Sequence, residues 1–312
     1  MDMMSEKPQN LSRIFNPSNK TGIVEECLEI AESFLDKKDQ RDLRYRWDKT
    51  TDLFEGTFPG YQACNTEYHD YNHTCDVFCA TVRMCDGALA SGVTMTPELL
   101  LDTCTAAMLH DAGYIMEDTD STGTGAKYTR VHVSRSVSFA MNNRDAFHLT
   151  DDSADRVGRL ISGTDLALEF DEIPFADHGE RHAAELVASA DLMGQMADRT
   201  YLEKLLFLYY EFREARFPGY DTEFDILKKT LSFYESTKFR LFETLHNAAR
   251  FAFDHFEHRY GVASNLYLES IQNQIDYLES IIVDDSVNFR KKLKRLNLEE
   301  VSRTHQHIEL HA

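Results

Sequence analysis

The 312-residue sequence has little proline and glycine, few cysteines and no long apolar stretch. Its 6 Pro and 14 Gly provide few helix breakers, and the strict apolar–polar alternation typical of strands is almost absent. The most apolar stretch, residues 99–109, is short and interrupted by Asp102, which excludes a membrane-spanning helix. Residues 1–10 are polar and lack the apolar core of a signal peptide, so we expect a cytoplasmic protein.

Cysteine and basic residues are also scarce. None of the six cysteines forms a Cys-x-x-Cys pair, and without an export signal they are typical of buried, reduced thiols. The 33 basic residues are outnumbered by 53 acidic ones, giving a net charge of −20. Such a protein repels a phosphate backbone, which excludes general binding to nucleic-acid polymers. A small anionic substrate would need a local positive charge, such as bound metal ions.

Helical spacing of apolar residues recurs along the whole chain and predicts an all-α protein. Thr96-Pro97-Glu98 is a helix start, with an N-cap, a proline in the first turn and an acid behind it, and Gly113 is the expected stop. We expect a compact multi-helix domain over residues 46–312, with residues 1–45 as a loosely attached helical cap. Beyond the helix that begins at Thr96, the predicted helices cover residues 21–37, 66–90, 128–142, 151–167, 178–197, 199–215, 222–247, 249–259, 264–283 and 287–299.

One predicted helix carries a stripe that could pair two chains. Ile271, Ile275, Leu278 and Ile282 follow the 4-3-4 spacing of a helix-pairing seam. Two heptads are short for a coiled coil, so packing on the parent domain is the favoured interpretation and a homodimer is the alternative.

The first chemically informative segment is Tyr68 to Val77. On the predicted helix over residues 66–90, His69 and His73 are one turn apart and Asp76 joins their face. Two imidazoles and a carboxylate on one stripe are costly to bury without partners. The alternative is that hydrogen bonds satisfy them as structural residues.

Two further segments add candidate metal ligands. His110-Asp111 closes an otherwise apolar helix, and Asp191 lies among small and apolar residues. Imidazole nitrogen and carboxylate oxygen together suit zinc, manganese, iron or magnesium. A single buried acid such as Asp191 needs a cation or several donors.

The ordered set resembles the HD superfamily of metal-dependent phosphohydrolases, and most closely the catalytic domain of class I cyclic-nucleotide phosphodiesterases. The phosphodiesterase signature Tyr-His-Asn-x-x-His-x-x-Asp-Val is matched by Tyr68 to Val77, with Asp70 in place of Asn. The family's Ala-Asp-Leu is matched at residues 190–192, and its Thr-Asp dipeptide at residues 164–165. The resemblance covers roughly residues 66–215.

This resemblance implies a hydrolase of phosphoric esters, acting on a cyclic nucleotide or a similar small phosphodiester, with two divalent metal ions (zinc, magnesium, manganese or iron). Asp111 would bridge the two metals, and a hydroxide between them would be the nucleophile. His69 would be the general acid and Asp76 would orient a ligand histidine. The ligands of the first metal would be His73, His110, Asp111 and Asp191.

The sequence departs from the phosphodiesterase pattern at two places. Tyr114 stands where the phosphodiesterases have a histidine after the His-Asp pair, and His132 on the next predicted helix could compensate. Tyr114 and His132 are therefore candidates for the second metal or its water shell. Thr237 stands where the purine-binding glutamine would be sought, so specificity for cyclic nucleotides does not follow.

Other histidines are expected outside the site. Helical geometry places His178 and His182 opposite Asp191, at the surface. His255 and His258 are expected at the surface or in ring stacks, and the histidines within residues 305–311 belong to a polar C-terminal tail.

Two other functions remain open. One is a nucleotidase or phosphomonoesterase of the HD type. The other is a degenerate HD fold that serves as a ligand-binding regulatory module, against which the complete set of four metal-ligand residues argues.

Overall fold

The computed structural model describes residue 11, residues 20–284 and residues 289–296. Within these residues the protein is all-α: helices are joined by loops and short 3₁₀ turns, and the only β pairing is an isolated bridge between Tyr61 and Glu117. The predicted all-α class is therefore confirmed.

The α-helices of the described part vary from one turn to five turns or more. They are α2 (Lys20–Glu32), α3 (Lys37–Glu55), α4 (Tyr71–Ala90), α5 (Pro97–Leu109), α6 (His132–Asn142), α7 (Asp151–Ser162), α8 (His178–Ala197), α9 (Tyr201–Glu214), α10 (Glu223–Phe239), α11 (Arg250–Tyr260), α12 (Leu266–Asp284) and α13 (Phe289–Lys292).

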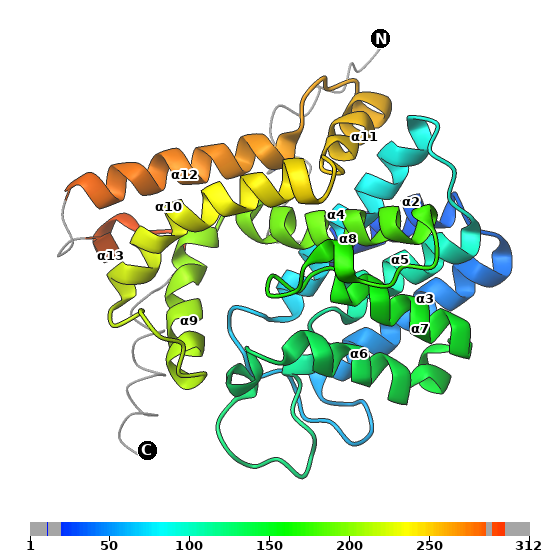
Figure 1. Cartoon of the computed structure of the whole chain (residues 1–312), viewed down its shortest axis with the longest axis horizontal. Coiled ribbons are helices and arrows are strands. Elements are labelled where there is room, and N and C mark those ends of the chain that lie inside the picture. The colour runs from blue at the N-terminus through cyan, green and yellow to red at the C-terminus, as the bar shows by residue number, and fades with distance from the viewer. Residues whose placement is uncertain (1–10, 12–19, 285–288, 297–312) are drawn as a thin grey trace.

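Helix α4 lies at the centre of the molecule and packs against α2, α5, α8 and α11. All its residues from His73 to Ala88 are buried, including the charged side chains of Asp76, Arg83 and Asp86. Helices α6 and α7 pair with one another, while α10 and α12 run side by side at the opposite end of the molecule (Figure 1). None of the described helices is long and apolar enough to cross a membrane.

The N-terminal part is built differently from the expected cap. Helix α3 was not predicted, and it runs without a break across the expected boundary at residue 45. It begins at the N-cap Asp36 and ends at Gly56, which has the left-handed φ of 79° that favours glycine. Leu43 and Leu53 of α3 are fully buried, so the segment is joined to the main core.

The helix that carries His73 begins later than predicted. The side chain of Asp70 accepts a hydrogen bond from the backbone N–H of His73 at 2.8 Å and so caps α4, which begins at Tyr71. His69 therefore precedes the helix, and the prediction that His69 and His73 share a helical face is wrong. Asparagine and aspartate are both good N-cap residues, so the cap position accounts for an Asp at residue 70.

The helix start at Thr96 is confirmed, but its predicted stop is not. Thr96 accepts a hydrogen bond from Leu99 N–H at 3.2 Å, whereas α5 ends at Leu109 and Gly113 lies in a following 3₁₀ turn. A Cβ on Gly113 would lie 1.9 Å from the carbonyl oxygen of His132. Gly113 is therefore a point of close approach between this turn and α6, not a helix cap.

Two more predictions for the C-terminal half differ from the structure. Helix α10 ends at Phe239 and passes into a π-helical turn over Arg240–Thr244, so the predicted helix over 222–247 is too long. His246 and Asn247 then adopt left-handed φ values of 48° and 56°, which no helix continues. The predicted helix over 287–299 lies partly outside the described residues. Within the described residues 289–296, the helix α13 covers only Phe289–Lys292.

The Ile271 stripe and the cysteines pack as expected. Ile271, Ile275 and Leu278 are buried against the same chain, where α12 contacts α8 and α10, and Ile282 is partly buried against the same core. The prediction of packing on the parent domain is therefore confirmed, and these side chains do not form an exposed seam. The cysteines are free thiols, buried except for the half-buried Cys64.

Candidate metal centre and cavity

Four side chains from three helices meet at one point inside the protein. His73 lies in the first turn of α4, His110 and Asp111 follow the last turn of α5, and Asp191 lies in the middle of α8. The capped start of α4 and the packing of α4 against α5 and α8 bring these positions together. His73, His110 and Asp111 are buried, and Asp191 opens toward a cavity.

The ligand atoms of this cluster have the spacing of a metal site. His73 Nε2 lies 3.4 Å from Asp111 Oδ2 and 3.2 Å from Asp191 Oδ1. His110 Nε2 lies 3.3 Å from Asp111 Oδ2, 3.7 Å from Asp191 Oδ1 and 3.2 Å from His73 Nε2. A metal ion with bonds of about 2.0–2.2 Å holds its ligand atoms roughly 3–3.5 Å apart. The spacing therefore fits a cation bound by His73, His110 and Asp111. Asp191 Oδ1 lies beside both histidine nitrogens and is a further candidate ligand.

The hydrogen bonds around the cluster leave its centre-facing atoms for a cation. His110 Nδ1 donates to the carbonyl oxygen of Ala107 at 2.8 Å, which directs the Nε2 lone pair toward His73 and Asp111. Asp111 Oδ2 is buried and has no hydrogen-bond partner among the described residues. A buried carboxylate oxygen without a donor is costly unless a cation or proton neutralises it. The donor set therefore fits a divalent metal.

The charges of the cluster also favour a bound cation. Burial lowers the pKa of His110, but the charge of Asp111 outweighs it and the pKa rises to about 9. Burial raises the pKa of Asp111, but the neighbouring histidines, His110 first, hold it well below its usual range. The carboxylates thus create a strongly negative potential at the point where the histidine nitrogens converge.

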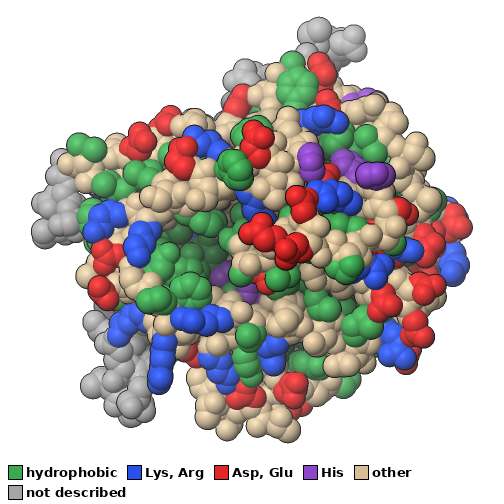
Figure 2. All heavy atoms as spheres, viewed as in Figure 1, with side chains coloured by type: hydrophobic (Ala, Val, Ile, Leu, Met, Phe, Trp, Pro, Cys, Tyr) green, Lys and Arg blue, Asp and Glu red, His purple; other side chains and the backbone are tan. Residues whose placement is uncertain are grey.

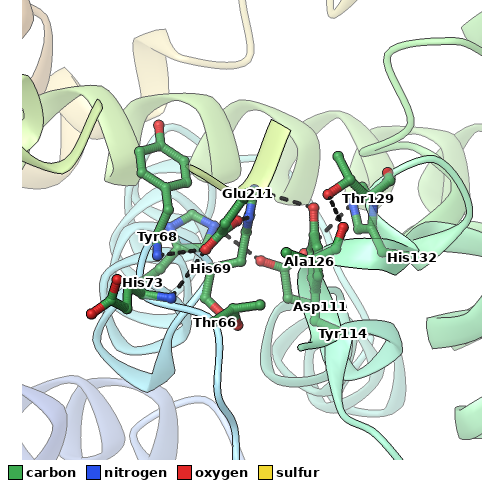
Figure 3. A network of polar contacts seen from close by, with 12 residues as sticks. Thr66, Tyr68, His69, His73, Asp111, Tyr114, Ala126, Thr129, His132 and Glu211 are labelled. Carbon is green, nitrogen blue, oxygen red and sulfur yellow. Dashed lines mark hydrogen bonds and ion pairs between the residues drawn. The ribbon is translucent and has the colours of Figure 1, made fainter. Parts of the chain in front are cut away.

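His69 stands beside the cluster and is held by a residue that the sequence analysis missed. His69 Nδ1 lies 2.6 Å from Glu211 Oε2, on the buried face of α9 (Figure 3). The other carboxylate oxygen of Glu211 accepts the backbone N–H groups of Glu67 at 3.0 Å and Tyr68 at 2.8 Å. One carboxylate therefore fixes both the ring of His69 and the loop that carries it. Burial lowers the pKa of His69, but Glu211 opposes this and the pKa is raised.

Tyr114 and His132 complete a stack of three rings with His69. The ring centroids are 4.3 Å apart between His69 and Tyr114, and 4.5 Å apart between Tyr114 and His132. His132 Nδ1 donates to the carbonyl oxygen of Thr129 at 2.7 Å, and its Nε2 lies 3.7 Å from Asp111 Oδ1 (Figure 3). Burial lowers the pKa of His132, which favours a neutral ring with a lone pair on Nε2. Both residues are therefore close to the cluster, as the sequence analysis expects.

The remaining predicted residues lie at varying distances from the cluster. Asp76 is buried on α4, and its backbone is in close contact with Gly194 of α8. The role expected for Asp76, orienting a ligand histidine, stays a prediction. Thr164 and Asp165 line the cavity beside the cluster. Thr237 is buried and does not line the cavity.

Among the other histidines, His255 corrects the sequence analysis. It is fully buried, and its Nδ1 lies 2.6 Å from Asp86 Oδ2, so it is not a surface residue. Its ring meets that of Phe256 edge-on, with the centroids 5.1 Å apart. His178 is exposed as expected, whereas His182 is half-buried beside Glu185. The histidines within residues 305–311 lie outside the described residues.

A cavity of about 490 Å³ opens above the cluster, within the range of about 300–1,000 Å³ for small-molecule sites. His69, His73, Asp111 and Asp191 form part of its lining. Figure 2 shows the hollow in the molecular surface, with histidine in its depth and hydrophobic side chains on its walls. A small molecule in the cavity would therefore lie directly against the candidate metal ligands.

Comparison with known proteins places the same segment in one family. A family model described as Npun_R2479-like matches residues 60–251, more than half of the chain. The matched residues include the four side chains of the cluster, His69, His132 and Glu211. A search of curated proteins finds no match.

Proposed function

The chain belongs to the Npun_R2479-like family, and we propose that it is a metal-dependent phosphodiesterase that hydrolyses small phosphodiesters. The observation that carries this proposal is the convergence of two histidine nitrogens and two carboxylates at 3.2–3.7 Å, at the end of a cavity of substrate size. On this proposal the family is a branch of the HD superfamily, with the ordered motifs and the all-α fold as support.

The first divalent ion would be held by His73, His110, Asp111 and Asp191. Divalent cations in such a site lower the pKa of water and neutralise the charge of a phosphoryl group. The protein supplies imidazole nitrogens and carboxylate oxygens, and the hydrogen bond from His110 to Ala107 fixes which ring nitrogen would bind the ion.

A second ion would use the other oxygen of Asp111 together with His132. Asp111 Oδ1 and His132 Nε2 are 3.7 Å apart, and neither atom takes part in the first cluster. Tyr114, stacked on His132, keeps that ring in place and occupies the position of the histidine in the phosphodiesterase pattern. The proposal therefore assigns zinc, magnesium, manganese or iron to two neighbouring positions.

His69 would protonate the leaving group. Hydrolysis breaks one P–O ester bond, water supplies the new oxygen on phosphorus, and the departing alkoxide takes a proton from the histidine. With Nδ1 bound to Glu211, the proton to be donated would be on His69 Nε2, which lies 3.4 Å from the Tyr114 hydroxyl. The charge of Glu211 raises the pKa of His69 and so favours the protonated acid.

The test combines metal analysis with hydrolysis. Purified protein should contain zinc, manganese, iron or magnesium, and should cleave bis-p-nitrophenyl phosphate faster than p-nitrophenyl phosphate. His73→Ala and Asp191→Ala should lose bound metal and turnover together, while His178→Ala, an exposed histidine of α8, should retain both. Faster cleavage of the monoester would favour a phosphomonoesterase. The proposal would be contradicted if the purified wild-type protein contained no metal and hydrolysed neither ester after any of the four metals was added.

A further inference from the structure

The walls of the cavity differ in chemistry from the cluster of metal ligands. Away from the metal ligands the lining is dominated by apolar side chains of α9, the turn after it and α10. Three of them, Phe212, Phe217 and Tyr220, form a continuous surface that we call the aromatic wall. The Phe212 ring centroid lies 4.8 Å from that of Phe217 and 4.9 Å from that of Tyr220. Leu208 and Phe233 extend this surface along the neighbouring helices.

Two cations border the aromatic wall, but both are already engaged by the protein. Lys229 Nζ lies 4.3 Å from the Tyr220 ring centroid and donates to the carbonyl oxygen of Gly219. The Arg130 guanidinium lies 4.9 Å from the Phe217 centroid and donates to a backbone carbonyl at 3.1 Å. These contacts hold the two side chains against the rings, where they stabilise the wall.

Two hydroxyls and one carboxylate of the lining are bonded within the protein as well. The hydroxyls of Thr164 and Thr230 donate to backbone carbonyls one helical turn earlier, at 2.9 Å and 2.8 Å. The carboxylate of Asp165 accepts the backbone N–H of Ala167 at 2.8 Å. Gln195 is an amide of the lining, and it lies one turn after Asp191 on α8, which places it near the metal ligands.

This distribution discriminates between classes of ester group. A nucleobase carries several donors and acceptors, and burying them without partners costs free energy. A hydrocarbon group instead gains free energy from every apolar atom that leaves water. Resting on the phosphodiesterase function proposed above, we propose that the substrate is a phosphodiester with an alkyl or aryl ester group, which binds against the aromatic wall while the phosphoryl group faces the metal ligands.

The direct test compares three methyl phosphodiesters that differ in the second ester group. Hexyl methyl phosphate, dimethyl phosphate and the methyl ester of a nucleoside monophosphate are incubated with the metal-loaded protein, and the released alcohol is followed by NMR. We expect kcat/KM for the hexyl ester to exceed that for dimethyl phosphate at least about tenfold, because even one methylene contributes measurably in an apolar pocket. A nucleoside ester hydrolysed faster than the hexyl ester would overturn the inference.

A pair of phenylalanine variants locates the effect. Phe217→Ala should reduce the hexyl-to-dimethyl ratio of kcat/KM by about fivefold or more, because it removes a ring of the wall. Phe239→Ala removes an exposed phenylalanine outside the cavity lining and should leave that ratio unchanged. Equal ratios in both variants and the wild type would show that the wall does not select the substrate.

Binding separates this inference from the proposed function. Hexylphosphonate should bind the wild-type protein at least about tenfold more tightly than methylphosphonate in calorimetry, with a negative heat-capacity change, and Phe217→Ala should reduce the difference. If no diester is hydrolysed but this binding difference holds, the proposed reaction fails and the apolar site stands. If diesters are hydrolysed but the two phosphonates bind equally, the apolar site fails and the reaction stands.

Discussion

Asp111 is the residue on which the two parts of the candidate site depend. Its Oδ2 faces His73 and His110, and its Oδ1 faces His132 on a different helix. A carboxylate with two independently oriented oxygens can join two cations, which a histidine in the same place could not do. The side chain is buried, so its ionised form requires the positive charge that surrounds it.

Glu211 offers the sharpest residue-scale prediction. Replacing it by glutamine should lower kcat for dimethyl phosphate about 10- to 100-fold, because His69 loses the charge that raises its pKa and the acceptor that orients its ring. The general acid works only when protonated, so activity falls as the pH rises through the pKa of His69. In Glu211→Gln this pKa is lower, and the alkaline limb of the pH–rate profile should move to lower pH.

The control for this experiment is Glu214→Gln on the same helix. Glu214 accepts a hydrogen bond from the Thr124 hydroxyl at 2.6 Å and has no contact with His69. Its variant should keep the wild-type rate and pH profile, and bound metal should be unchanged in both variants. An unshifted alkaline limb in Glu211→Gln would show that Glu211 does not tune His69.

The sequence predicts part of this site and misses the rest for a physical reason. His73, His110, Asp111 and Asp191 could be singled out because charged or imidazole groups in apolar surroundings require partners, and the resemblance to the HD phosphohydrolases implies that they form one ligand set. Glu211 is separated from His69 by 142 positions, and it occurs on a helix with two other glutamates, Glu203 and Glu214. Nothing local distinguishes it, since its role comes only from the packing of α9 beside the start of α4.

At the scale of elements, the sequence mispredicts the ends of helices where one or two residues determine them. Asp70 moves the start of α4 past His69, and the left-handed residues His246 and Asn247 end the helical path after α10. Helix α8 was predicted over its observed residues 178–197, because its apolar periodicity is long and unbroken. Helix α3 was missed because charged residues surround its buried positions, although Asp36 and Gly56 mark both ends.

The contact between α4 and α11 contains a buried ionisable pair that predicts a pH dependence. His255 Nδ1 lies 2.6 Å from Asp86 Oδ2, and Arg259 binds the same carboxylate. His255 Nε2 is buried without a partner among the described residues, and burial lowers the pKa of this histidine below its usual value. The unfolded protein therefore binds this proton more readily, and the contribution of His255 to the free energy of unfolding should decrease as the pH falls below about 6.5. The contributions of His69 and His110 have the opposite sign, because their pKa values are raised.

This dependence can be measured by chemical denaturation at pH values from about 7.5 to 5.5. His255→Gln should show a smaller decrease in the free energy of unfolding over this range than the wild type, whatever its stability at neutral pH. His258 is exposed on the same helix, so the free energy of unfolding of His258→Gln should change with pH as much as that of the wild type. Below this range the lowered pKa of Asp86 adds a further loss, because its ionised form stabilises the folded state only above its unfolded pKa. If the free energy of unfolding of His255→Gln changed with pH as steeply as that of the wild type, His255 would not be the source of this dependence.

At the scale of the whole molecule, the acidic surface and the buried cluster make different predictions for metal binding. A net charge of −20 attracts divalent cations to many places. The cluster instead would hold an ion specifically through His73, His110, Asp111 and Asp191, and an ion that binds only the folded state stabilises it. Manganese at about 100 times its dissociation constant should raise the free energy of unfolding by about 2.7 kcal/mol.

Thermal unfolding with and without manganese measures this effect. The wild type and the His178→Ala control should each gain several degrees in Tm, whereas His110→Ala should gain almost none, because it lacks a nitrogen of the cluster. Titration at high ionic strength keeps the comparison specific, since salt screens the exposed carboxylates and leaves a buried site nearly unaffected. A gain in His110→Ala equal to that of the wild type would mean that manganese acts through the acidic surface, and the four converging side chains would then not be a metal site.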